Sequence, residues 1–379
     1  MSKELQEILH KLQEIPASEP TVLATVVDVR GSSYRLPGAR MLIDENGNSL
    51  GTISGGCLEA DVLERARKVL QTGISQIIAY DTRDNEDSLF GLQMGCNGVI
   101  RVLLETGRDN RLLNFVESCF NERRSGAVAT LVSVPANISL PIGTRYFFDD
   151  KNYAEHDFSD TGFSEKLESA ARQVLESKRS RCEIFQTPNG EVEFFVELIA
   201  PPVSLYVFGA GFDARPVTDF AKNLGWRVSV IDHRATFAAR ERFPAADEVL
   251  VLPSEDLQGN LAINENSAAV IMTHSYNRDR EILRFLLYSK AVYVGALGPK
   301  RRTEKLLEEL KAEGADFSAE QLKKLFAPVG LDIGANTPEA IALSIIAEVQ
   351  SVLSNREGGF LRRRESSIYE RQSVSASKF

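Results

Sequence analysis

Short apolar runs follow one another through the second half of the chain, and helical segments separate them. Runs rich in aromatic and β-branched residues predict buried parallel strands at 204–208, 227–231, 248–252, 268–272 and 291–295. Residues 214–223, between the first two runs, have the pattern of a helix. This alternation of strands and helices predicts an α/β domain built on a parallel sheet.

The first half has shorter strands, and part of its pattern recurs. The sequence Ala-Thr-Val-Val-Asp-Val at 24–29 matches 129–134, and 66–70 matches 171–175, each at an offset of 105 residues. The strand expected at 99–105 likewise resembles one that ends at Glu197. We therefore predict that residues 20–105 and 125–200 are two copies of one α+β unit, packed together.

A glycine turn follows the strand at 204–208. Gly209 and Gly211 let a phosphate approach the N–H groups at the start of the next helix, and Ala214 takes the third small position. Asp232 ends the following strand, where dinucleotide-binding domains carry the carboxylate that holds a ribose hydroxyl. This order predicts a Rossmann-like domain that binds NAD(P) or another nucleotide. The alternative is a Rossmann-like scaffold whose nucleotide site is not used.

The pattern thus divides the chain into four parts. We expect α+β units at 1–110 and 111–202, and the Rossmann-like domain at 203–353. The tail, 354–379, is rich in serine and arginine, and we expect it to be flexible or docked in an oligomer.

A second glycine loop opens onto a helix in the first half. Gly55 and Gly56 let consecutive N–H groups converge on an anion, and Cys57 stands where a helix macrodipole lowers the pKa of a thiol. With Ser54, they predict a site for a ligand that carries both a phosphate and a thiophilic metal or sulfur centre. The alternative is that Cys57 is a small buried hydrophobic residue.

Comparison of the two copies points to the same region. Where the first copy has the 54–57 loop and Cys96, the second has Asp-Thr-Gly-Phe at 160–163 and Pro188. A residue type that the scaffold lacks in one copy is a candidate for chemistry in the other, so Cys57 and Cys96 are candidate site residues, and a thiophilic metal is one centre that they could contact. Arg35 and Arg40 would add charge-assisted bonds to the phosphate. A third hypothesis is a redox sensor that forms a disulfide between the two cysteines.

Two further groups lie at the carboxyl edge of the predicted parallel sheet. His274 follows the strand at 268–272 and is a candidate acid or ligand. Alternatively it is a loop histidine that bonds the backbone, with Asp279 capping a helix at 280–287. Lys300 and Arg301 follow a glycine turn after the strand at 291–295, and they either clamp a phosphate or form a solvated face.

Composition narrows the class of protein. Of 379 residues, 43% are hydrophobic and 26% charged, as in a globular protein of two or three domains. A net charge of −9 argues against non-specific nucleic-acid binding, and four cysteines argue against a disulfide framework. The sequence has no run of about 18 apolar residues and no signal-peptide core, so we expect no membrane span and a cytoplasmic protein.

Several longer motifs occur in order along the chain. In the first half they are Gly-Ser-Ser at 31–33 with Arg35, Pro-Gly-Ala-Arg-Met at 37–41, and Gly-Thr-Ile-Ser-Gly-Gly-Cys-Leu-Glu at 51–59. The second half adds the Gly209 turn, Gly-Ala-Leu-Gly at 295–298, Gly-Leu-Asp-Ile-Gly at 330–334 and Thr-Pro-Glu at 337–339. On these motifs nearly the whole chain resembles the XdhC/CoxI family, the accessory proteins of xanthine dehydrogenase and related molybdenum hydroxylases.

The resemblance implies a protein that binds molybdenum cofactor (molybdopterin), protects it while a cysteine desulfurase supplies its sulfido ligand, and passes it to xanthine dehydrogenase or a related hydroxylase. Such a protein acts as a homodimer and is not a turnover enzyme by itself. The pterin phosphate would lie on the Gly55-Gly56 loop, with Cys57 and Cys96 near molybdenum. The rival hypothesis is an NAD(P)-dependent oxidoreductase in which Asp232 selects NAD and His274 donates a proton.

Overall fold

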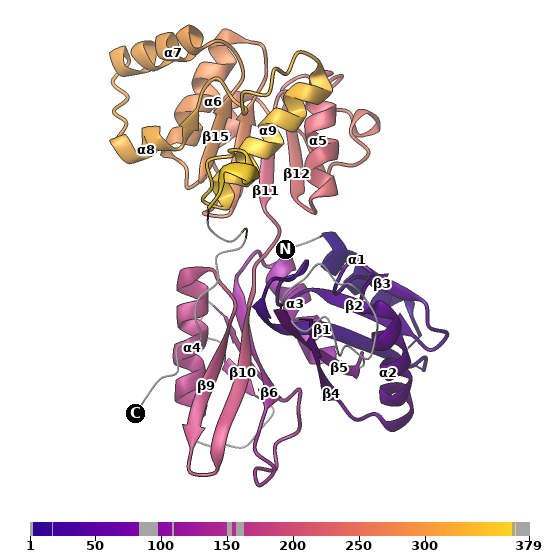
Figure 1. Cartoon of the computed structure of the whole chain (residues 1–379). Coiled ribbons are helices and arrows are strands. Elements are labelled where there is room, and N and C mark those ends of the chain that lie inside the picture. The colour runs from indigo at the N-terminus through magenta and orange to yellow at the C-terminus, as the bar shows by residue number, and fades with distance from the viewer. Residues whose placement is uncertain are drawn as a thin grey trace. The chain divides into compact units, whose positions relative to one another are not determined.

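The computed structural model describes residues 3–16, 18–82, 98–107, 110–149, 154–156, 163–365 and 368. These residues form two compact units, Lys3–Pro201 and the part from Pro202 onward (Figure 1). The domain boundaries expected within the first unit remain predictions. Among the described residues, every helix is too short or too polar to cross a lipid bilayer.

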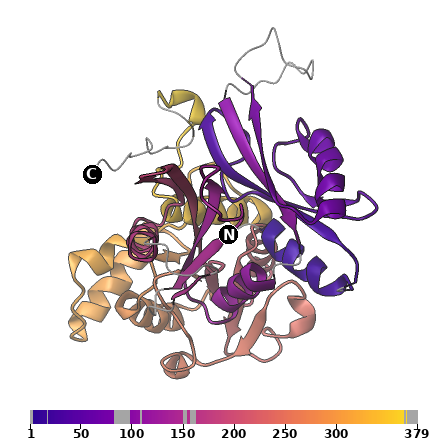
Figure 2. The same ribbon diagram turned by 90° about the horizontal axis from the view of Figure 1, so that it is seen from below.

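The first copy of the repeat is an antiparallel sheet with strand order β3-β2-β1-β5-β4. Helix α2 covers one face of this sheet (Figures 1 and 2). The elements are α1 (Lys3–Glu14), β1 (Thr21–Gly31), β2 (Arg40–Asp44), β3 (Ser49–Gly51), α2 (Glu59–Thr72), β4 (Gln76–Asp81) and β5 (Gly98–Thr106).

The second copy repeats this arrangement. Its antiparallel sheet has the equivalent order β8-β7-β6-β10-β9, and helix α4 covers the corresponding face. The elements are α3 (Asn110–Asn121), β6 (Gly126–Ser133), β7 (Arg145–Asp149), β8 (Ala154–His156), α4 (Ser164–Ser177), β9 (Arg181–Thr187) and β10 (Gly190–Ile199).

The other faces of the two sheets pack on each other. Alternate residues of a strand point to opposite faces, so Val26 lies under α2 while Val27 reaches the contact between the sheets. There Val27 and Leu103 meet Val132 and Phe195 of the second copy, all nearly fully buried. Val27 and Val132 are separated by the same 105 residues as the sequence repeat, so equivalent positions of the two copies face each other.

Two buried ion pairs cross between the copies at equivalent places. Arg40 donates to both oxygens of Glu197, at 2.7 and 2.5 Å, and Arg145 donates to both oxygens of Glu105, at 2.5 and 2.6 Å. Arg40 and Arg145 hold the same position in the two copies, so each copy supplies one arginine and one glutamate. Equivalent residues of the two copies form both ion pairs, so the contact between the copies is self-complementary, as in a two-fold dimer.

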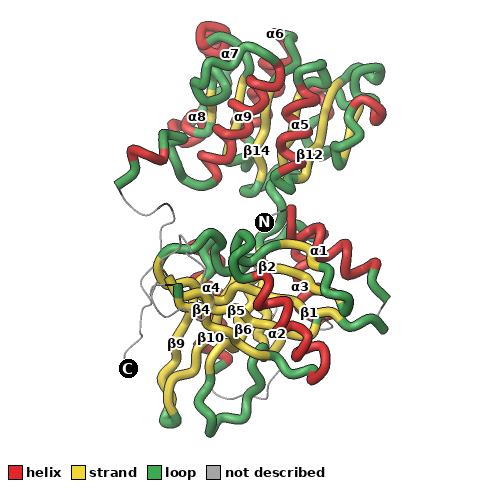
Figure 3. Tube along the Cα trace, turned by 45° about the vertical axis from the view of Figure 1, so that its right-hand side comes forward, coloured by secondary structure: helices red, strands yellow, loops and turns green. Residues whose placement is uncertain are grey.

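The C-terminal unit is a parallel sheet with strand order β13-β12-β11-β14-β15-β16. Helices α5 and α9 pack on one face and α6 and α7 on the other (Figure 3). The elements are β11 (Ser204–Phe208), α5 (Ala214–Asn223), β12 (Arg227–Asp232), β13 (Glu248–Val251), β14 (Ser267–Ile271), α6 (Tyr276–Tyr288), β15 (Tyr293–Ala296), α7 (Lys300–Ala312), α8 (Ala319–Lys323), β16 (Leu325–Phe326) and α9 (Pro338–Leu353).

This order is the one typical of Rossmann folds, in which the connections change direction beside the first strand. The change lies between β11 and β14, and ligands of such sheets bind at that point, outside the carboxyl ends of the strands. The predicted fold class, a C-terminal Rossmann-like sheet with an N-terminal α+β part, is confirmed.

One element at this edge differs from its prediction. Helix α6 begins at Tyr276, four residues before the expected start, so Asp279 lies inside the helix and does not cap it. Its buried carboxylate accepts hydrogen bonds from Thr273 Oγ1 and from Arg302 Nη1 instead. The alternative interpretation, in which Asp279 caps the helix, was therefore wrong, because tertiary partners satisfy this carboxylate.

Candidate functional site

The loop that leads into α2 folds around the carboxylate of Glu59. Glu59 lies in the first turn of the helix, where the macrodipole favours an anion. Its Oε1 accepts from Thr52 Oγ1 at 2.6 Å and from the backbone N–H groups of residues 53, 54 and 55 at 3.3, 2.9 and 3.2 Å. Its Oε2 accepts from Ser54 Oγ, and from the N–H groups of residues 56 and 58 at 2.9 and 3.2 Å. One side chain thus holds the whole loop.

These contacts keep Glu59 ionised. Burial by itself raises the pKa of this carboxyl, but the hydrogen bonds from Ser54, Thr52 and the backbone outweigh burial and lower the pKa to about 2. The loop is therefore an anion cradle, as the glycines indicated, but the anion in it belongs to the chain. The N–H groups of Gly55 and Gly56, which we expected to hold a phosphate, donate to Glu59.

The same loop presents Cys57 to solvent. Cys57 is exposed, whereas Cys119 is buried and Cys182 half-buried. Gly55 and Gly56 both have positive φ, +116° and +113°, which side chains other than glycine rarely adopt. A Cβ built on Gly56 would meet no atom within 4 Å, so the space beside Gly56 is open.

The two arginines predicted to join the phosphate have carboxylate partners. Arg40 is 5% exposed and holds Glu197 of the second copy. Arg35 forms an ion pair with Glu4 of α1, whose Oε1 also accepts from Thr52 N at 2.6 Å. The structure does not bring Arg40 to the cysteine loop as a ligand contact, and Arg35 braces the loop through Glu4. Cys96 lies outside the described residues.

In the C-terminal unit, the turn after β11 has the tight packing that its glycines predict. Gly209 has φ +113°, and a Cβ there would clash with the carbonyl of Met272 at the end of β14. A Cβ on Gly211 would clash with the carboxylate of Asp213, and Ala214 is fully buried at the start of α5. The turn therefore lies close against β14, at the point where the strand order reverses.

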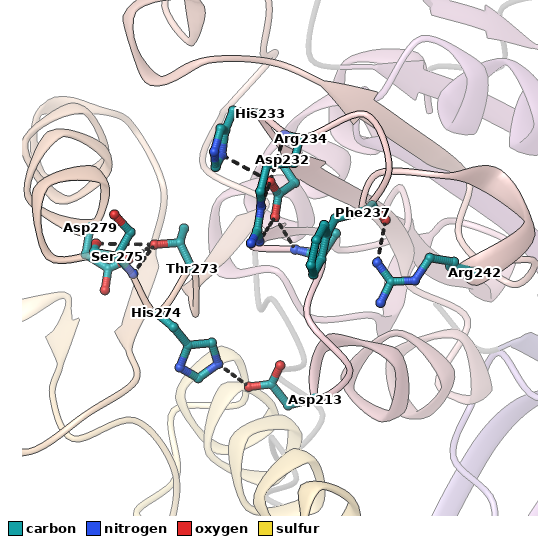
Figure 4. Close-up of polar contacts among 11 residues, drawn as sticks. Asp213, Asp232, His233, Arg234, Phe237, Arg242, Thr273, His274, Ser275 and Asp279 are labelled. Carbon is teal, nitrogen blue, oxygen red and sulfur yellow. Dashed lines mark hydrogen bonds and ion pairs between the residues drawn. The ribbon is translucent and has the colours of Figure 1, made fainter.

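Asp232, at the end of β12, is bound by neighbouring residues (Figure 4). Its Oδ2 accepts from Ala210 N at 2.9 Å and from Arg234 Nη2 at 2.8 Å. Its Oδ1 accepts from Arg234 N and Nε at 2.9 and 3.0 Å, and His233 Nδ1 lies 3.1 Å away. Burial raises the pKa of Asp232, but the bonds from Arg234 and Ala210 lower it to about 2.

His274 and Asp213 bridge the same edge. His274 Nε2 lies 2.8 Å from Asp213 Oδ2, so a residue after β14 contacts a residue after β11 (Figure 4). His274 is 63% exposed, and its backbone has φ +57°. A left-handed backbone conformation is uncommon for a histidine outside a helix end, so His274 is a candidate for a functional role.

The cations at 300–302 divide into two groups. All three are in the first turn of α7, but Lys300 and Arg301 are exposed, while Arg302 is half-buried against Asp279. Among the described residues, the only charged partner of the two exposed cations is Glu304, whose Oε1 lies 3.9 Å from Lys300 Nζ. No three His, Cys, Asp or Glu side chains within the described ranges gather in a way that suits a metal ion.

The sequence interpretation did not identify three residues of these sites. Glu59 stands in the 51–59 motif, and an acid in the first helical turn after two glycines is a signal for an internal anion. Asp213 lies inside the glycine turn, and Arg234 lies two residues after Asp232. Both were visible in the sequence, but nothing in it showed that they would occupy the ligand positions.

Comparison with known proteins agrees with this fold. The profile of the XdhC and CoxI family matches residues 15–81, and the profile of the XdhC Rossmann domain matches residues 205–349. A protein of Bacillus subtilis (strain 168), named as a probable xanthine dehydrogenase component, is 33% identical over 333 residues. These residues are 87% of this chain and 92% of that protein.

Two further proteins match over nearly the whole chain. The molybdenum cofactor insertion chaperone PaoD of Escherichia coli (strain K12) is 24% identical over 347 residues, 91% of this chain and 87% of PaoD. The crystal structure of a xanthine dehydrogenase from Bacillus halodurans superposes with a TM-score of 0.75 at 32% identity, and the match covers 94% of this chain and 97% of that one.

Proposed function

The chain belongs to the XdhC and CoxI family, and on that basis we propose that it binds molybdenum cofactor and serves the maturation of xanthine dehydrogenase or a related molybdenum hydroxylase. In this proposal the chain keeps the cofactor while a cysteine desulfurase supplies the sulfido ligand, and then passes it to the hydroxylase. Two chains act together as a homodimer. The name of PaoD, an insertion chaperone for this cofactor, supports the transfer step.

The observation that carries the proposal is the exposed thiol of Cys57 on a fixed loop. Thiolates are soft ligands and suit a thiophilic metal such as molybdenum. Glu59 ties the backbone on both sides of Cys57 to one carboxylate, so the thiol is presented from a framework that needs little ordering when a ligand arrives. Because the glycine N–H groups serve Glu59, the loop presents a metal contact and leaves the pterin phosphate to other groups.

The test compares two expression hosts, one replete in molybdenum and one unable to make the cofactor. Bound molybdenum is measured by elemental analysis, and pterin by fluorescence of the denatured extract. We expect both signals from the replete host alone. Wild-type protein that carries neither, and that also fails to bind added cofactor, would contradict the proposal.

Two cysteine variants localise the contact. Cys57→Ser should lose most of the bound molybdenum while the chain stays folded. Cys182→Ser is the matched control, because a serine hydroxyl can replace the thiol that donates to Val27 O at 3.4 Å. Equal molybdenum in all three proteins would remove Cys57 as the ligand and leave the carrier function in place.

A further inference from the structure

We propose that the Rossmann-like unit does not hold a nicotinamide or flavin dinucleotide, because side chains of the chain itself fill the places of the ribose and the pyrophosphate. This inference does not depend on the proposed function. It concerns the carboxyl edge of β11, β12 and β14, where the fold family places such a ligand.

The carboxylate that would bind the ribose already has its hydrogen-bond donors. In a dinucleotide-binding domain, the acid at the end of the second strand accepts hydrogen bonds from the ribose. Here the Asp232 side chain is 2% exposed and already accepts four hydrogen bonds, with His233 Nδ1 as a fifth neighbour. A carboxylate offers about four lone-pair sites, so no acceptor is left for two ribose hydroxyls.

Moving Arg234 aside is unfavourable. Its guanidinium lies over the Phe237 ring at 3.7 Å, and Arg242 lies over the same ring at 4.9 Å and donates to Phe237 O at 3.0 Å. If Arg234 left, the buried Asp232 carboxylate would lose its charged partner. A ribose 2′-phosphate would attract Arg234 but would then lie beside an ionised carboxylate, so neither form of the nicotinamide cofactor fits.

The pyrophosphate position is filled as well. A dinucleotide lays its pyrophosphate across the N-terminus of the helix after the first strand. Asp213 occupies that N-terminus without making a cap hydrogen bond, and it reaches across the switch point to His274. The ligand would have to break this bond and place its negative charges beside a carboxylate. Repulsion over a few ångströms lowers affinity by about tenfold or more.

The test is a titration of the full-length chain with NADH and NADPH. Trp226 is the only tryptophan, and it is buried in the core beside β12, so energy transfer from it to the nicotinamide reports binding. The variants are Asp213→Ala, Arg234→Ala and their combination. Asp213→Ala removes no cap bond and should stay folded. Arg234→Ala leaves the Asp232 carboxylate without its charged partner and lowers stability, so circular dichroism checks the fold of each variant before the titration. Lys222→Ala is the control, because it breaks an ion pair with Asp247 at the far end of α5.

We expect no saturation by either nucleotide for wild type and Lys222→Ala up to about 1 mM. The double variant should gain at least about tenfold in affinity, and Asp213→Ala alone should gain part of it. Wild-type binding with a Kd below about 100 μM would overturn the inference. Folded variants that gain nothing would also overturn it, since other groups would then close the edge. If the double variant fails to fold, the two single variants decide by the same criterion.

Discussion

Replacement of Glu59 by glutamine tests how the cysteine loop is held. Glu59→Gln keeps the size of the side chain but removes its charge and turns one acceptor oxygen into an NH₂ donor. Oε2 accepts from Ser54 Oγ and from the N–H groups of Gly56 and Leu58, and an amide nitrogen in its place would face three donors. Unpaired donors and the lost charge should both destabilise the folded N-terminal unit.

The lowered pKa gives the magnitude. The difference between the usual 4.5 and about 2 corresponds to roughly 3.4 kcal/mol at 1.36 kcal/mol per pH unit. Glu59 is only half-buried, and solvent screening reduces the expected loss in free energy of unfolding to about 2 kcal/mol. For a unit of about 200 residues, this is a fall in Tm of roughly 4–8 °C.

The sign of the pH dependence follows from the same pKa. Because the folded-state pKa is lowered, the contribution of Glu59 is fully present above pH 4.5 and is lost as the pH falls toward 2. The difference between wild type and Glu59→Gln should therefore be largest at neutral pH and shrink between pH 4.5 and 2.

Calorimetry of the full chain is the assay, with Trp226 fluorescence as the reporter of the C-terminal unit. The N-terminal transition should move while the fluorescence transition stays in place. A Tm shift below about 1 °C at pH 7 would refute the account of the loop, since it corresponds to less than about 0.5 kcal/mol. A shift of the same size at neutral pH and at about pH 2.5 would refute the role of the charge.

Three further predictions concern other residues. Arg40→Met should cost about 3–5 kcal/mol in free energy of unfolding by leaving Glu197 buried and unpaired, and adding Glu197→Leu should recover most of it, as denaturant titrations would show. Gly55→Ala places a Cβ on a residue with φ +116°, 3.0 Å from the ring of Tyr34. The strain should distort the loop that carries Cys57, so the variant should hold less molybdenum when it is made in the replete host. Cys57 should react with iodoacetamide at least about tenfold faster than Cys182 in peptide mapping, because burial raises the pKa of Cys182 and Cys57 is exposed.

Local patterns made the C-terminal fold predictable. The strand at 204–208 and the helix at 214–223 have their predicted bounds, because a buried apolar run between a proline and a glycine leaves few alternatives. The 105-residue repeat likewise indicated two similar sheets, and the equal strand orders agree with it.

The sequence alone could not predict which charged residues pair with each other. Arg40 and Glu197 are 157 residues apart, and only the packing of the two sheets brings them together. The same holds for His274 and Asp213, which meet because β14 lies beside β11. A glycine turn shows where an anion fits, but it does not show whether a ligand or a nearby side chain supplies the anion.

The most direct test of the central claim is X-ray absorption at the molybdenum edge on the full chain loaded with cofactor. If Cys57 contacts the metal, wild type should show one more sulfur neighbour of molybdenum than Cys57→Ser, and Cys182→Ser should match wild type. The same sulfur count in wild type and Cys57→Ser would contradict the contact, and wild-type protein without molybdenum would contradict the carrier function itself.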